Sequence, residues 1–77
     1  MKFVHSDRYL QLGLKIAYYR KLKGLTQEQL AEMVDLNTST IGQIEAPNIV
    51  RAVSMDTLFD IADALEIPPY KLIMFEE

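Results

Sequence analysis

The 77 residues are 49% apolar and 25% charged, with no cysteine, which indicates one folded domain over residues 1–77 and excludes disulfide scaffolds and thiolate metal sites. No signal peptide and no apolar run of the roughly 20 residues that cross a bilayer is present, so we expect a cytoplasmic protein without a membrane partner. The net charge is −3, but the charges are unevenly distributed. Residues 1–51 hold seven basic and five acidic residues, whereas residues 52–77 hold one basic and six acidic residues. The first part of the chain is therefore compatible with binding an anion.

Helical periodicity runs through nearly the whole chain, and no segment alternates as a strand does. The first helix is expected over residues 7–23, where Leu12, Ile16 and Tyr19 recur at helical spacing. It should end at Gly24, because glycine readily adopts the left-handed conformation that follows many helices.

Two short helices joined by a tight turn are expected over residues 27–45. Thr26, with a glutamine three residues later, is a capping-box signature for the start of the first of them. Asp35 stands in the turn, where the backbone needs the left-handed conformation. Asn37 or Thr38 then caps the second helix, which ends before the next proline.

The last part of the chain predicts two further helices. After a loop at residues 48–53, Ser54 is a cap for a fourth helix with the clearest amphipathic pattern in the chain, formed by Leu58, Ile61, Ala62 and Leu65. Two adjacent prolines then precede a short helix over residues 70–75. Five short helices with short connections predict a compact all-α domain.

A set of residues at fixed spacing lies between Leu12 and Ile73. In chain order its members are Ile16, Arg20, Gly24, Leu25, Thr26, Gln27, Leu30, Ala31, Leu36, Ser39, Thr40, Ile41, Ile44, Glu45, Ser54, Met55, Thr57, Leu58, Ile61, Ala62, Ala64 and Leu65. In order and spacing this set resembles the Cro/C1-type helix-turn-helix family, also called the Xre family, of phage repressors and bacterial regulators. The resemblance implies a lambda-repressor-like fold of five helices, in which the third helix reads the major groove of double-stranded DNA.

The resemblance also implies roles for individual residues. Base contacts are implied for Thr38, Ser39 and Gln43, whose amide and hydroxyl groups can bond base edges. DNA backbone contacts are expected from Gln27, Asn37, Thr40, Asn48 and Arg51. Arg20 and Glu45 are expected as a scaffold ion pair that joins the first helix to the third. No cofactor, metal or small-molecule substrate is implied.

The chain departs from the family pattern in three places. Asp35 stands where glycine is usual, so a somewhat strained turn is expected. Gly42 lies inside the third helix at a cost of about 1 kcal/mol relative to alanine, and it either permits close approach to DNA or relieves crowding. Pro47 and an apolar pair, Ile49 and Val50, replace the usual glycine and lysines of the following loop, which predicts weak non-specific affinity for DNA.

An enzyme is not expected, because the chain holds one histidine, His5, and no phosphate loop or metal-spaced cluster. The carboxylates of Asp56, Asp60 and Asp63 have helical spacing and are interpreted as a solvated face. The alternative function is a protein-interaction module or antitoxin that uses the same fold with little specific DNA reading. Among DNA-binding regulators, a phage-type repressor, a restriction–modification controller and an antitoxin remain open.

One domain reads too few base pairs to find a single operator, so a homodimer on a palindromic site is expected. The candidate dimer surface consists of Tyr70, Ile73 and Met74, beside Pro69 and with help from the apolar loop residues Ile49 and Val50. Leu72 and Phe75 are instead assigned to the core.

Overall fold

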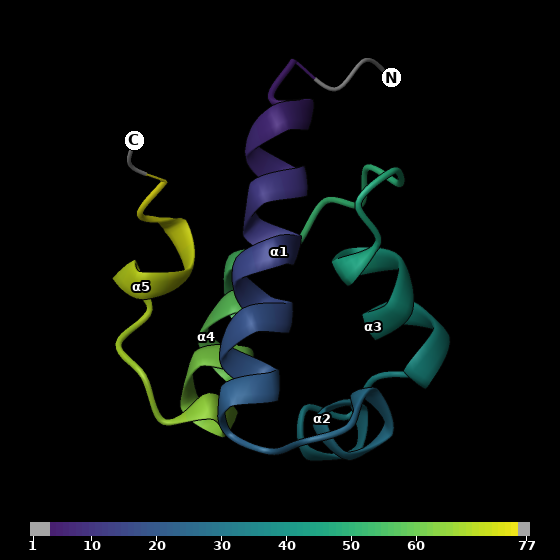
Figure 1. Cartoon of the computed structure of the whole chain (residues 1–77), viewed down its shortest axis with the longest axis vertical. Coiled ribbons are helices and arrows are strands. Elements are labelled where there is room, and N and C mark those ends of the chain that lie inside the picture. The colour runs from purple at the N-terminus through teal and green to yellow at the C-terminus, as the bar shows by residue number, and fades with distance from the viewer. Residues whose placement is uncertain (1–3, 76–77) are drawn as a thin grey trace.

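The computed structural model describes residues 4–75, which form helices and no strands. The helices are α1 (Ser6–Leu22), α2 (Gln27–Met33), α3 (Thr38–Glu45), α4 (Met55–Leu65) and α5 (Tyr70–Ile73). α1 stands in the middle of the molecule, with α3 on one side, α5 on the other and α4 behind it (Figure 1). The predicted all-α fold of five helices is confirmed. No helix within the described residues is long and apolar enough to span a membrane.

Three helices, α1, α2 and α4, end in the same way, with a residue of positive φ just beyond the last turn. These residues are Gly24 (φ 81°), Asp35 (φ 58°) and Glu66 (φ 59°). The amide of the next residue then bonds a carbonyl five positions earlier, at 2.9 to 3.0 Å, in the pairs Leu25–Arg20, Leu36–Ala31 and Ile67–Ala62. This closure satisfies carbonyls at each helix end and folds an apolar side chain back onto the core.

The core is a single cluster of aliphatic side chains drawn from all five helices. Its buried members are Leu12, Ile16, Leu30, Ala31, Ile41, Ile44, Leu58, Ile61, Ala62, Leu65 and Leu72. α1 and α3 approach most closely at Gly13, where an added Cβ would lie 1.9 Å from the carbonyl oxygen of Ile44. Sequence reasoning missed this glycine, although a glycine inside a helical pattern is itself a signal of close packing.

The helix boundaries agree with the prediction to within one residue except at the C-terminal end. The last helix was expected over residues 70–75, but α5 ends at Ile73 because the backbone of Met74 is extended (φ −89°, ψ 94°). After that change of direction, Phe75 packs against the core. At α3, Asn37 occupies the cap position without a side-chain hydrogen bond, whereas the capping box begun by Thr26 is complete.

Candidate nucleic-acid interface

A buried ion pair between Arg20 and Glu45 ties the end of α3 to α1. Arg20 Nε donates to Glu45 Oε2 at 2.7 Å, and Arg20 Nη2 donates to Glu45 Oε1 at 2.9 Å. The remaining guanidinium nitrogen, Nη1, donates to the backbone oxygen of Leu25 at 2.7 Å. The two side chains are only 9% and 4% exposed. Since both buried charges are fully partnered in a two-bond geometry, the pair fixes how α3 lies against α1.

Gln27, the first residue of α2, extends this network toward the surface. Its amide Nε2 donates to Glu45 Oε1 at 3.0 Å, and the side chain is half-buried. A glutamine amide carries two N–H groups, and within residues 4–75 this hydrogen bond engages one of them. The amide is therefore held at the junction of α2 and α3 before any ligand arrives.

The outward face of α3 presents the three residues expected to contact bases. Thr38, Ser39 and Gln43 are all exposed, while Ile41 and Ile44 bury the opposite face of the helix. α3 lies at the edge of the molecule, so this face is turned away from α1 (Figure 1). The result is a polar helix surface held on a rigid apolar base.

Gly42, which follows Ile41 on α3, has space around it. An added Cβ would meet only the side-chain oxygen of Gln27, at an ordinary contact distance of 3.6 Å. Crowding within the described chain therefore does not require glycine here, unlike at Gly13. Of the two explanations open from the sequence, relief of crowding is therefore not supported by the geometry.

The loop after α3 supplies a cation to the same face. Arg51 is exposed, and its Nη1 donates to the side-chain oxygen of Gln43. Among residues 4–75 no carboxylate pairs with Arg51. Asn48 is exposed in the same loop, Asn37 is exposed at the start of α3, and Thr40 is half-buried. The structure thus links Gln27 and Arg51 directly to the candidate interface.

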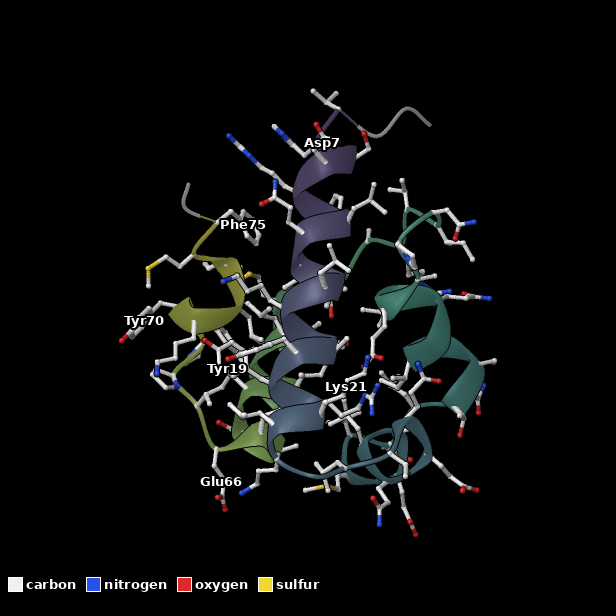
Figure 2. The ribbon with its side chains drawn as sticks, in the orientation of Figure 1. Asp7, Tyr19, Lys21, Glu66, Tyr70 and Phe75 are labelled. Carbon is white, nitrogen blue, oxygen red and sulfur yellow. The ribbon has the colours of Figure 1, made fainter. Side chains whose placement is uncertain are left out.

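The surface expected to form a dimer is only partly assembled. Tyr70, Ile73 and Met74 are exposed on or next to α5, and Tyr70 projects away from α1 (Figure 2). The loop with Ile49 and Val50, however, lies on the other side of α1 from α5 (Figure 1). The two apolar groups therefore do not form one continuous surface.

The arrangement suits recognition of a polar surface. In the part of the chain that the structure describes, no three metal-ligating side chains come together. The polar groups of α3 are exposed and anchored from behind by a buried ion pair. Such a face can offer hydrogen bonds to a ligand of matching shape without rearranging its own backbone.

Comparisons with known proteins place this geometry among described regulators. The family described as Helix-turn-helix matches residues 16–72. The HTH-type transcriptional regulator YazB of Bacillus subtilis is 42% identical over 55 residues, which are 71% of this chain and 77% of YazB. The control protein C.SmaI of Serratia marcescens is 37% identical over 62 residues, 80% of this chain and 71% of C.SmaI. The crystal structure of the restriction-modification controller protein C.AhdI from Aeromonas hydrophila is similar with a TM-score of 0.78 and 33% identity, covering 86% of this chain and 97% of C.AhdI.

Proposed function

The chain belongs to the Cro/C1-type helix-turn-helix family of transcriptional regulators, and from this premise we propose that it binds specific double-stranded DNA with α3 in the major groove. The observation that carries the proposal is the outer face of α3, where Thr38, Ser39 and Gln43 are exposed on a helix locked from behind. A major groove about 12 Å wide admits one α-helix and shows each base pair a distinct hydrogen-bonding pattern.

Each exposed group has a chemical role in this proposal. Gln43 can pair with adenine through its oxygen and its amide N–H groups, once Arg51 turns from that oxygen to a phosphate. The hydroxyls of Thr38 and Ser39 can bond base edges. The second N–H of Gln27 is placed for a phosphate at the start of α2, and the remaining proposed backbone contacts are Asn37, Thr40 and Asn48.

We further propose that the active form is a homodimer that uses Tyr70, Ile73 and Met74, all about half exposed. Two-fold dimers of this docking type read half-sites about 34 Å apart, or multiples of that distance. Sedimentation of the free chain at micromolar concentration should show a dimer, which Ile73→Glu should convert to a monomer. A monomer for the unsubstituted chain, together with a selected site lacking two-fold symmetry, would remove the dimer from the proposal.

Selection of bound sequences from a random duplex pool, at stated salt, tests the DNA-binding proposal itself. A palindromic motif should be enriched by the unsubstituted chain, and Glu32→Ala, on the exposed side of α2, should enrich the same motif. Ser39→Ala should change the preferred base at one position in each half-site. If no sequence is enriched even at low salt, the alternative of an interaction module or antitoxin replaces this function.

Among the regulatory roles, control of a restriction–modification system has the best support. C.AhdI is named as a restriction-modification controller protein and C.SmaI as a control protein, and each matches most of this chain. The genes next to this one provide the check: a neighbouring endonuclease or methyltransferase gene supports the controller role. A toxin gene or prophage genes in that place would instead favour an antitoxin or a phage-type repressor.

A further inference from the structure

The outer face of α1 carries an unpaired apolar stripe. Leu14, Tyr18 and Leu22 are 51%, 58% and 70% exposed, and their spacing of four residues aligns them on one side of the helix. Lys15 and Lys21 flank the three side chains, and Figure 2 shows Lys21 at the edge of α1. We call these five residues the α1 stripe. Aligned apolar side chains bordered by charges are a common form of protein contact surface.

A second surface, of opposite charge, lies where α4 meets the end of α2. A hollow of about 420 Å³ is lined by Met33, Val34, Asp35, Asp60, Asp63 and Ala64, which we call the α4 hollow. Its three carboxylates are exposed, and Met33 is 54% exposed at its edge. Phe59, also exposed, lies on the same outer side of α4. The hollow therefore offers carboxylates next to apolar groups.

These charges form no ion pairs within residues 4–75. In residues 4–75 the ion pairs are Arg20–Glu45 and Lys23–Glu66, which leaves the lysines of the α1 stripe and the aspartates of the α4 hollow unpaired. No three carboxylates lie close enough together to hold a metal ion in the described structure. Such dispersed carboxylates are matched better by separate ammonium groups on a partner surface than by a single metal ion.

The two surfaces cannot meet within one molecule. α1 crosses in front of α4 (Figure 1), and each helix turns its buried side toward the other. Their outer faces consequently point in opposite directions. A contact between them joins one copy of the chain to the next in a head-to-tail manner, which adds copies in a row and does not close into a two-fold pair.

We propose that the α1 stripe of one copy docks on the α4 hollow of a second copy. Leu14, Tyr18 and Leu22 then cover apolar groups such as Met33, while Lys15 and Lys21 meet the aspartates. The contact is separate from the two-fold surface on α5 and needs no DNA.

Charge exchange tests the proposal by sedimentation without DNA. The unsubstituted chain should form species larger than a dimer as its concentration rises. The variants Lys15→Glu/Lys21→Glu and Asp60→Lys/Asp63→Lys each place like charges together, so each should associate at least about tenfold more weakly. An equimolar mixture of the two should regain the association, because every contact in it again joins opposite charges. Glu28→Lys, on α2 outside both surfaces, is the matched control and should behave as the unsubstituted chain.

Three outcomes overturn the proposal. The unsubstituted chain could stop at a dimer at every concentration, or the mixture could associate no better than its components. The exchange at Lys15 and Lys21 could instead strengthen association, which would mean that two α1 stripes pair with each other. Unchanged melting temperatures and circular dichroism spectra show that the variants are folded, and since no DNA is present, a failure here is distinct from a failure of the proposed function.

Discussion

The side-chain amide of Gln27 donates its hydrogen bond to the same carboxylate of Glu45 that binds Arg20, at 3.0 Å. One carboxylate therefore both closes the buried ion pair between α1 and α3 and positions an amide that we propose contacts a phosphate. The scaffold and the candidate interface are joined at this point.

Replacing Glu45 should destabilise the fold strongly. Glu45→Ala leaves the guanidinium of Arg20 buried without its partner, which costs about 3–5 kcal/mol of unfolding free energy. Glu32→Ala, on the exposed side of α2, should change it by less than about 0.5 kcal/mol. Urea unfolding followed by circular dichroism measures both, and similar small losses would show that the ion pair contributes little.

The two helical glycines should respond to alanine in opposite directions. Gly42→Ala adds a methyl group that meets only the side-chain oxygen of Gln27, at an ordinary contact distance of 3.6 Å, and should raise the unfolding free energy by up to about 1 kcal/mol, while weakening DNA binding if the glycine admits the DNA. Gly13→Ala places a Cβ against the backbone of Ile44 and should lower the unfolding free energy by about 3 kcal/mol or more. Thermal melts distinguish the two variants. A lower melting temperature for Gly42→Ala would contradict the absence of close contacts around an added Cβ at that position.

The turn between α2 and α3 should accept glycine. Asp35 has a φ of 58°, a conformation that disfavours residues with a Cβ. Asp35→Gly should therefore raise the unfolding free energy by about 0.5 kcal/mol, after the greater freedom of glycine in the unfolded chain is taken into account. Glu66→Gly, at a similar φ of 59°, should gain less because it also loses the ion pair with Lys23. A loss of stability in Asp35→Gly would mean that the aspartate side chain stabilises the turn.

Arg51 and Gln43 are hydrogen-bonded to each other but should affect DNA binding differently. Arg51→Ala removes one proposed phosphate contact, so the slope of log K against log salt should decrease by about 0.9 while the preferred sequence stays the same. Gln43→Ala should leave that slope unchanged and lose about 1–3 kcal/mol of discrimination at one base pair. Salt titrations on the selected site and on its single-base variants distinguish the two, and identical effects would argue against separate roles.

The ion pair between Lys23 and Glu66 should contribute to stability in a pH-dependent manner. The hydrogen bond and positive charge of Lys23 lower the pKa of the Glu66 carboxyl group. Because the folded pKa lies below the unfolded one, the contribution is present above the unfolded pKa and is lost as pH falls through the folded pKa. Lys23→Gln should raise the pKa of Glu66 in an NMR titration, and its stability deficit should shrink toward low pH. A deficit independent of pH would assign the effect to lost packing.

Local signals in the sequence determined the helices and most of the core. The capping box at Thr26, the left-handed turn residues Gly24 and Asp35 and the i, i+3, i+4 spacing around Leu58 each depend on neighbours within a few residues, so they can be read without the fold. The left-handed conformation of Glu66 after α4 was not predicted. The end of α5 was also missed: the helix stops at Ile73, where the backbone of Met74 becomes extended, and no local signal had indicated that change.

The resemblance indicated the pair of Arg20 and Glu45, but only the tertiary structure showed several other contacts between distant parts of the chain. Gln27 bonds a carboxylate 18 positions away, Gly13 touches the backbone of Ile44, and the outer faces of α1 and α4 point apart. The helical period in the sequence predicts which residues lie on each face of a helix. Which other helix that face contacts depends on how the helices cross. The crossing in turn depends on how side chains pack together across the whole core.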